Sequence, residues 1–346
     1  NTYEDLSKNP FIWPKSSEIV EKEQKQLVLD NLIARREIIR MHFKDDVVNG
    51  VPNWFPTRKQ FNSEFVNAEY LANIIDFLSE SDVSIDPIGR NFLEGSSKIT
   101  FRDRYVFINW LVLTHSQFSM CSDTLYLAIS LSDRFIKANK ETLIATDLII
   151  IGIVCLFMAA KIEEIWIPTI NDLLSLWNLE YTKEFCSELE IQILCAVNFQ
   201  LSLPVPISFI RHYSILFSSN NLSQFLSRYF CELSLQDSEA CCQSCSLIGA
   251  SCVFLSEVIS RNITSDFSVV WTPKLQASSG LVYADFQNLV KNLCIIVQKQ
   301  ATSSNLRAIT QKYSCVGYMN APNEALNSKA FRSIFLHFRN QIQANQ

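Results

Sequence analysis

The sequence predicts an all-α fold built from two helical domains. Apolar residues recur at helical spacing along most of the chain, whereas glycine, which marks turns and cradles phosphate groups, accounts for only 7 of 346 residues. No glycine-rich nucleotide-binding motif occurs. Because domains usually contain ~100–200 residues, the length favours two domains, or two domains with an extension.

Breaks in the helical pattern define the segments. Residues 1–64 are predicted to be an N-terminal extension, partly helical or disordered, because breaker residues follow a charged helical stretch. Residues 65–200 hold one preceding helix and a first domain of five helices. Two prolines then interrupt the pattern, so a second domain of similar size is predicted at 201–322 and a C-terminal tail at 323–346.

Apolar stripes place the individual helices. The most apolar window, Leu148–Ala160, has 13 residues. A membrane span needs ~20, so this window is predicted to be a buried central helix of a soluble protein. Thr182 is predicted to cap the last helix of the first domain. The helices are expected at about 69–78, 102–116, 121–137, 141–162, 168–177, 182–197, 208–217, 224–235, 238–259, 283–298 and 306–312.

Charge and cysteine content exclude several classes of protein. The net charge is −5 and no run of lysine and arginine stands out, which disfavours a direct nucleic-acid binder. The start of the chain is polar and acidic, unlike a signal peptide, and the 11 scattered cysteines suggest reduced thiols. Cys241, Cys242 and Cys245 are predicted to pack in a core rather than hold zinc. We expect no metal or cofactor, and a nuclear or cytoplasmic location, or both.

Charged residues on apolar helix faces are the most informative ones. Arg104 and Asp133 each lie on such a face of neighbouring predicted helices, and because an isolated buried charge is costly, we expect them to form a structural ion pair. Lys161 ends the most apolar helix, and Glu190 interrupts another. The pattern alone favours a solvated helix end for Lys161 and an exposed face for Glu190.

Several ordered motifs carry a resemblance to the cyclin family, closest in pattern to A- and B-type (mitotic) cyclins. The resemblance covers about residues 65–322. The motifs are RYVFINWL (Arg104–Leu111), LYLAISLSDRFI (Leu125–Ile136), MAAKIEEIWIP (Met158–Pro168), the continuous run YTKEFCSELEIQILCAVNFQLSLPVPISFI (181–210), and, in the second half, WTPKL and AITQKYSCVGYMNAP (Ala308–Pro322).

The resemblance implies two tandem five-helix cyclin-box domains that bind and activate a cyclin-dependent kinase as a heterodimer, in cell-cycle control. The chain would then be a regulatory subunit and not an enzyme. Lys161 and Glu190 match the family's kinase-facing pair, and Arg104 and Asp133 match its internal pair. The residues that match kinase contacts are Lys161, Ile162, Glu163, Glu164, Glu190, Leu194 and Phe199.

A substrate-docking patch departs most from the family. The resemblance implies an apolar floor for the leucine of an Arg-x-Leu peptide and a glutamate for its arginine. The floor matches Phe107, Trp110 and Leu148, but Leu113 replaces the glutamate and Ile149 replaces a glutamine. The remaining acidic candidate is Asp103. Because Asp103 stands three positions after Thr100, at the start of a predicted helix, a capping box is favoured over peptide binding.

Two rival classes remain open at this point. A cyclin-fold protein of transcription, or a scaffold that does not activate a kinase, would share the helices. A transcription factor of the initiation type would also call for a zinc ribbon and a basic surface, and the sequence shows neither. A Cys/His hydrolase calls for a nucleophile motif, and the four histidines (His42, His115, His212 and His337) stand in none.

Overall fold

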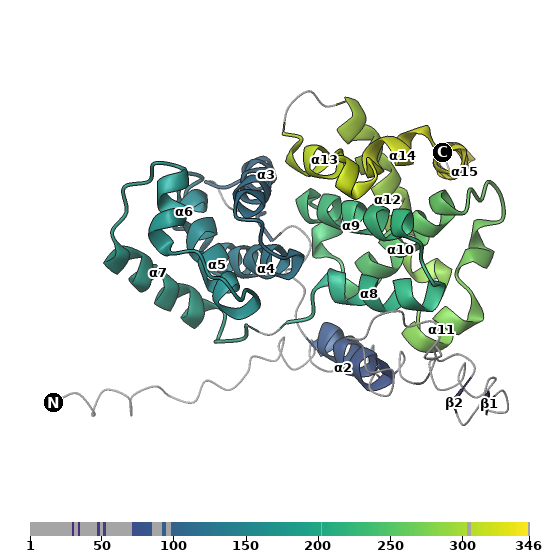
Figure 1. Ribbon diagram of the computed structural model, residues 1–346, viewed down its shortest axis with the longest axis horizontal. Helices are drawn as coiled ribbons and strands as arrows, with labels where there is room; N and C mark the ends of the chain where they lie inside the picture. Colours follow the sequence, from purple (N-terminus) through teal and green to yellow (C-terminus); the bar gives the residue numbers. More distant parts are fainter. Residues whose placement is uncertain are drawn as a thin grey trace.

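The protein is described here by a computed structural model that shows two helical bundles side by side (Figure 1). The structure describes residues 71–84, 92–94, 98–201, 203–302 and 306–344, with Asp30, Ala34 and two short strands. The strands β1 (Val47–Val48) and β2 (Val51–Pro52) pair antiparallel. Most of the predicted extension at residues 1–64 lies outside the described residues.

The first bundle surrounds one apolar helix, as the sequence predicts. Residues 150–156 of this helix, α5, are all buried, and α5 packs against α3, α4, α6 and α7. In the described part of the chain, no helix is long and apolar enough to cross a membrane. The helices of the bundle are α3 (Phe101–Gln117), α4 (Ser122–Asn139), α5 (Asp147–Glu163), α6 (Ile170–Leu176) and α7 (Lys183–Ala196).

Short polar residues fix where these helices begin. The capping box predicted for Thr100 and Asp103 is confirmed: the Asp103 amide donates to Thr100 Oγ1 at 3.2 Å, and the Thr100 amide donates to Asp103 Oδ2 at 2.9 Å. The predicted cap at Thr182 is also confirmed. The start predicted for α5, residue 141, is wrong. The carboxylate of Asp147 accepts the amide of Ile144, and this turn delays the helix to Asp147.

The second bundle begins where the two prolines interrupt the first. Its predicted helix at 238–259 is in fact broken, because the Asp237 carboxylate accepts the amides of Glu239 and Ala240 and caps a separate short turn. The elements are α8 (Pro206–Phe217), α9 (Asn221–Gln236), η4 (Ala240–Cys242), α10 (Cys245–Ser260), η5 (Phe267–Val270), α11 (Pro273–Ser279), α12 (Tyr283–Thr302), α13 (Ala308–Tyr313), η6 (Val316–Tyr318), α14 (Ala321–Asn327) and α15 (Lys329–Ala344).

The segment predicted as a C-terminal tail is largely helical. In α15, Phe331, Ile334 and Phe338 recur at intervals of three and four residues and are buried. This spacing gives a helix one apolar face. That face packs against α10, α12 and α14, so residues 329–344 extend the core of the second bundle.

Hydrogen bonds join the two bundles and hold a helix beneath them. Across the joint, Gln300 donates to Tyr105 Oη at 2.6 Å, and the Ala308 amide donates to the Asn109 side chain at 2.9 Å. Helix α2 (Leu71–Ser84) lies below α8 and α11 (Figure 1). Its buried Asp82 accepts the amides of Cys245 and Ser246, both at 2.9 Å, and so caps α10 from outside the bundle. The two bonds to Tyr105 and Asn109 fix the position of α3 against the second bundle.

Candidate partner-binding surface

The most deeply buried charges of the first bundle are Arg104 on α3 and Asp133 on α4. Arg104 Nε and Nη2 donate to the two carboxylate oxygens of Asp133 at 2.7 and 2.6 Å. Arg104 Nη1 donates to the carbonyl of Leu235 on α9 at 2.9 Å. Burial opposes the charged guanidinium, but Asp133 outweighs it and raises the pKa of Arg104. The pair ties α3 to α4 and to the second bundle, which is a structural role.

A second ion pair lies at the surface, between the end of α5 and the middle of α7. Lys161 Nζ donates to Glu190 Oε1 and also lies 4.7 Å from the centroid of the Phe157 ring. The two side chains are 37% and 24% exposed, so solvent or a partner can reach them. The sequence pattern alone favours two separate solvated charges. The structure joins them because α5 and α7 pack against each other.

The three residues after Lys161 point in different directions. Ile162 is 46% exposed and Glu163 is also exposed, while burial of its carboxyl raises the pKa of Glu163. Glu164 turns towards the start of α4. Its Oε1 accepts the amide of Cys121 at 2.7 Å and the hydroxyl of Thr124 at 2.5 Å. One carboxylate oxygen of Glu164 therefore serves as a cap within the chain, in addition to any contact with a partner.

A tight turn after α7 carries an exposed aromatic residue. Asn198 and Phe199 both have left-handed backbones, with φ of 51° and 57°. This conformation costs roughly 1–2 kcal/mol for a residue other than glycine. The Phe199 amide donates to the carbonyl of Leu194 at 2.9 Å, and its side chain is 65% exposed. The chain thus holds a large apolar side chain in solvent on a costly backbone, an arrangement that clusters at binding sites.

Sequence reasoning missed the most exposed apolar residues of this region. Ile165 and Trp166, in the loop after α5, are 92% and 89% exposed, and Ile191 on α7 is 60% exposed. The signal in the sequence is the run of large apolar residues between the end of an apolar helix and Pro168, where a loop is expected. With Phe199, these residues lie on or shortly after α5 and α7, the two helices that carry the Lys161–Glu190 pair. We call this set, Lys161, Ile162, Ile165, Trp166, Glu190, Ile191 and Phe199, the α5–α7 surface.

The floor of the predicted substrate-docking patch is largely buried in the structure. Phe107 and Leu148 are 3% and 2% exposed, and Trp110 is partly buried. The rings of Phe107 and Trp110 lie over Gly152 of α5, where a Cβ would collide with the Phe107 ring and crowd the Trp110 ring. Trp177, just after α6, packs on Trp110, with ring centroids 5.4 Å apart. Two of the three predicted floor residues thus present almost no surface to a peptide.

The rim of that patch is apolar. Leu113 and Ile149 are 36% and 38% exposed, and Val106, which the sequence reasoning did not single out, is 42% exposed. The sequence does not indicate that Val106 is exposed, because α3 is apolar on almost every side. Asp103 takes part in the capping box with Thr100, so the sole predicted acidic receptor of the patch is already engaged.

Chemistry of other kinds finds little support in the described residues. Within them, no group of three or more His, Cys, Asp and Glu side chains is placed to hold a metal ion. Cys241 Sγ and Cys242 Sγ lie 3.7 Å apart, and Cys245 Sγ contacts the carbonyl of Pro204. Burial raises the pKa of Cys155 to about 12, which disfavours the nucleophilic thiolate there.

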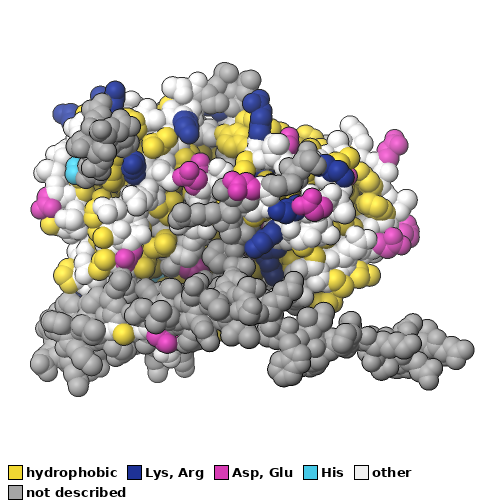
Figure 2. All heavy atoms as spheres, turned by 180° about the vertical axis from the view of Figure 1, so that it is seen from behind, with side chains coloured by type: hydrophobic (Ala, Val, Ile, Leu, Met, Phe, Trp, Pro, Cys, Tyr) yellow, Lys and Arg dark blue, Asp and Glu magenta, His cyan; other side chains and the backbone are white. Residues whose placement is uncertain are grey.

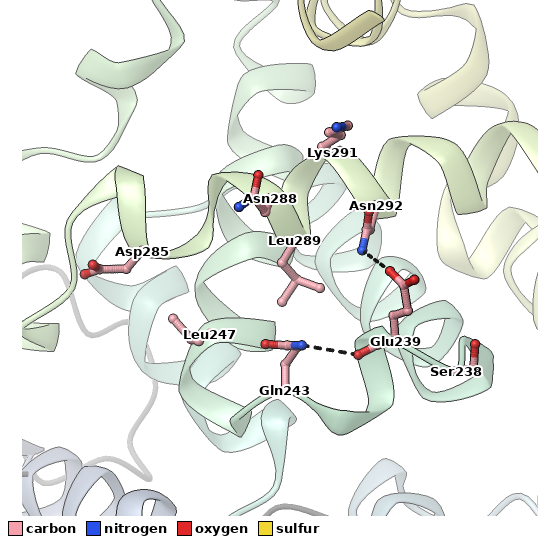
Figure 3. Close-up of a pocket in the computed structure, with 9 residues that line it drawn as sticks. All are labelled: Ser238, Glu239, Gln243, Leu247, Asp285, Asn288, Leu289, Lys291 and Asn292. Carbon is pink, nitrogen blue, oxygen red and sulfur yellow. Dashed lines mark hydrogen bonds between the residues drawn. The ribbon is translucent and has the colours of Figure 1, made fainter. Parts of the chain in front are cut away.

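The second bundle carries a hollow of about 530 Å³ between α10 and α12 (Figure 3). Its rim is polar: Asn292 donates to Glu239 at 3.0 Å, and Leu289 lies at its floor. None of the site residues predicted from the sequence lines it. On the face drawn in Figure 2, lysine and arginine side chains lie among acidic and apolar ones rather than in one continuous basic field.

Known proteins match both bundles. Residues 73–202 match the family "Cyclin, N-terminal domain", and residues 204–325 match "Cyclin, C-terminal domain". The chain is 31% identical over 250 residues to G2/mitotic-specific cyclin-B of Drosophila melanogaster, which covers 71% of this chain and 47% of that protein. It is 28% identical over 257 residues to G2/mitotic-specific cyclin-B3 of Gallus gallus, which covers 74% of this chain and 61% of that protein.

The fold agrees with these matches. The structure of a viral cyclin from herpesvirus saimiri superimposes with a TM-score of 0.54 at 18% identity, over 66% of this chain and 97% of that one. The chain spans about half to three fifths of the length of the fly and chicken relatives. The two helical bundles are thus tandem cyclin domains, and the chain belongs to the cyclin family as a divergent, B-type-like member.

Proposed function

We propose that the chain is a regulatory subunit that binds and activates a cyclin-dependent protein kinase in cell-cycle control. The observation that carries the proposal is the α5–α7 surface, where the solvent-accessible Lys161–Glu190 pair is bordered by large exposed apolar side chains. Patches of this kind mark sites where another protein binds. The family membership and the B-type relatives support a kinase as that partner.

The composition of the surface suits a specific protein partner. Tryptophan and other aromatic residues supply much of the binding energy at protein interfaces, and Trp166 and Phe199 are free to bury most of their area there. The ion pair adds hydrogen-bonding groups that can orient the partner. Lys161 keeps two further N–H donors, and Glu190 has a second carboxylate oxygen, so each can bind the backbone of a partner while the pair stays intact.

Activation follows from which kinase conformation the surface accepts. A protein kinase is active when a lysine on its β3 strand pairs with a glutamate on its αC helix, and the position of αC controls that pair. A surface that binds αC only in its active position shifts the population of the kinase towards the active state. The required difference in affinity between the two kinase states is the whole contribution of the cyclin, which needs no catalytic group of its own.

Reconstitution with a kinase tests the proposal. The chain is used to capture partners from an extract, the captured kinase subunit is identified by mass spectrometry, and the purified pair is assayed for phosphorylation of a peptide substrate. We expect a stoichiometric complex and kinase activity that depends on the chain. Complex formation without activation would instead indicate a scaffold.

Variants of the ion pair locate the interface. Truncating one partner of a charged network at an interface typically costs ~2–5 kcal/mol, and because this pair is partly exposed we expect a loss near the lower end for Lys161→Ala and for Glu190→Ala. The melting temperature should change little. The control is Lys291→Ala, on the rim of the hollow in the second bundle. Calorimetric titration showing unchanged affinity for the Lys161→Ala, Glu190→Ala double variant would remove the pair from the interface.

A further inference from the structure

A half-buried arginine holds the turn that presents Phe199. Arg134 lies on α4, next to Asp133 in the sequence, and its guanidinium reaches the end of α7. Nη2 donates to the carbonyl of Val197 at 2.8 Å, and Nη1 donates to the carbonyl of Gln200 at 2.7 Å. Those two carbonyls stand on either side of the left-handed residues Asn198 and Phe199. One planar group therefore clamps both ends of the turn.

The guanidinium of Arg134 binds two backbone carbonyls and no carboxylate among the described residues. Arg104, Arg211 and Arg261 all pair with carboxylates, whereas no salt bridge joins Arg134 to an acidic side chain in the part of the chain that the structure describes. Partial burial without a counter-ion lowers the pKa of Arg134. The last carbonyls of a helix lack intrahelical partners and carry the negative end of its dipole, so a cation there is favourable.

We propose that Arg134 is a positioning residue for partner binding: it fixes the Val197–Gln200 turn so that Phe199 is presented at the α5–α7 surface. The inference rests on the proposed function for its partner, a cyclin-dependent kinase subunit. Its structural half concerns the free chain alone. Phe199 is 65% exposed, so its direction depends mainly on the backbone on which it stands.

Hydrogen exchange in the free chain tests the structural half. The Phe199 and Gln200 amides donate to Leu194 and Val197 in the clamped turn. Hydrogen bonds to a charged group are worth about one to two factors of ten in an equilibrium constant, so in Arg134→Met these two amides should exchange at least about tenfold faster. Amides of α5 should not change. Unchanged protection at the turn overturns the proposal, whether or not any kinase binds.

A double-mutant cycle on kinase affinity tests the functional half. Removing an aromatic anchor costs about 30-fold in affinity, which we expect for Phe199→Ala, and we expect about tenfold for Arg134→Met. If Arg134 acts through Phe199, the double variant should bind about as weakly as Phe199→Ala alone. Multiplied losses would overturn the proposal, because Arg134 would then act independently. If Arg134→Met does not fold, Arg134→Lys, which keeps the charge but cannot span both carbonyls, enters the same cycle.

Arg261 in the second bundle provides a control for general loosening, since it holds a helix end and also pairs with the buried Glu257. Arg261 Nη2 donates to the carbonyl of Phe217, the last residue of α8, just before the left-handed Ser218. Arg261→Met should speed exchange near residue 218 and leave kinase affinity unchanged. An equal loss of affinity in Arg261→Met would show that general loosening explains the Arg134 result. If the wild-type chain binds no kinase, the proposed function fails, and the exchange experiment alone decides whether Arg134 holds the turn.

Discussion

The two bundles share an architecture but differ in what they expose. Among the described residues, thirteen large apolar side chains are exposed in residues 101–201 and four in residues 203–344. Yet each bundle buries an apolar central helix, α5 or α10. The difference therefore does not reflect a poorer core in the first bundle. More apolar side chains therefore lie on the outside of the first bundle, as the proposed partner-binding role of the α5–α7 surface requires.

The two bundles also differ in how exposed some of their charged groups are. In the second bundle, Glu232 and Glu257 are 1% exposed, and their carboxylates accept hydrogen bonds from neighbours such as Lys312 and Arg261. In the first bundle, the Lys161–Glu190 pair stays accessible. In the second bundle the Glu232–Lys312 pair joins α9 to α13, while the first bundle presents the Lys161–Glu190 pair at the surface.

The largest effect should come from the buried ion pair between α3 and α4. Arg104→Ala or Asp133→Ala leaves a buried charge without its partner, which typically costs ~3–5 kcal/mol. We expect a marked fall in the melting temperature for each, and strong coupling between them in a double-mutant cycle. The control is Asp123→Ala, which removes an ion pair to the half-exposed Arg211. Partly exposed pairs contribute far less than buried ones, so the melting temperature of this variant should fall much less than that of Arg104→Ala or Asp133→Ala.

A comparison of two exposed apolar residues tests whether the bundles differ in function. Trp166 in the first bundle and Val316 in the second are 89% and 94% exposed. Neither substitution by alanine should lower the melting temperature. Trp166→Ala should weaken kinase binding by about 2 kcal/mol or more, as for an interface anchor, while Val316→Ala should leave the dissociation constant unchanged. Equal effects on the affinity measured by calorimetry would remove the distinction between the bundles.

Acid should weaken the first bundle at Glu164. Burial opposes its charge, but hydrogen bonds from Thr124 and Cys121 hold the pKa of Glu164 below its usual value. A carboxyl with a lowered folded pKa contributes stability above its unfolded pKa, and this is lost as pH falls through the folded value. Loss of a helix cap costs ~1 kcal/mol, so Glu164→Gln should be destabilised by about that amount at pH 7.

Stability measured against pH checks this prediction. Denaturant unfolding of wild type and Glu164→Gln from pH 7 downwards should show the gap between them narrowing below the ordinary glutamate pKa. Glu163→Gln is the control, because burial raises the pKa of Glu163 and its carboxyl caps no helix. A gap for Glu164→Gln that stays constant with pH would show that the cap does not depend on the charge.

Local rules in the sequence located most of the helices, although they misplaced the start of α5 and missed α14 and α15, and they revealed few of the contacts between helices. Thr100 and Asp103 lie three residues apart, so the sequence itself shows the capping box. Glu164 and Thr124 are forty positions apart, and nothing at either position indicates that they meet. The two carbonyls that Arg134 binds are backbone groups, which every sequence supplies. Arg104 and Asp133 are the exception, because the cost of a buried charge demands a partner.

The sequence also could not show which residues of an apolar helix are exposed to solvent. In α3, Val106 and Phe107 are adjacent and similar in polarity, yet one is 42% and the other 3% exposed. The choice depends on Gly152 of α5, which makes room for the Phe107 ring. A helix that is apolar on nearly every side carries no stripe from which its outward face could be read. The predicted floor of the docking patch took Phe107 from the resemblance to the family, and the helical pattern gave no reason to add Val106.

The smallest effect is expected where the patch meets a charged peptide. An arginine gains affinity from a charge-assisted contact worth ~1.5–3 kcal/mol, provided that a carboxylate is free to receive it. Here Leu113 and Ile149 occupy the rim, and Asp103 Oδ2 already accepts both the amide and the hydroxyl of Thr100. Diverting that carboxylate to a peptide would uncap α3, so the two uses compete.

We therefore expect Arg-x-Leu peptides to bind weakly, and their Ala-x-Leu counterparts to bind almost equally weakly. Fluorescence polarisation with the matched peptides measures the difference. Leu113→Glu, which adds a carboxylate at the exposed rim, is the informative variant, because it should strengthen binding of the arginine peptide alone. A micromolar affinity of the wild type that depends on the arginine would mean that Asp103 serves the peptide rather than the helix.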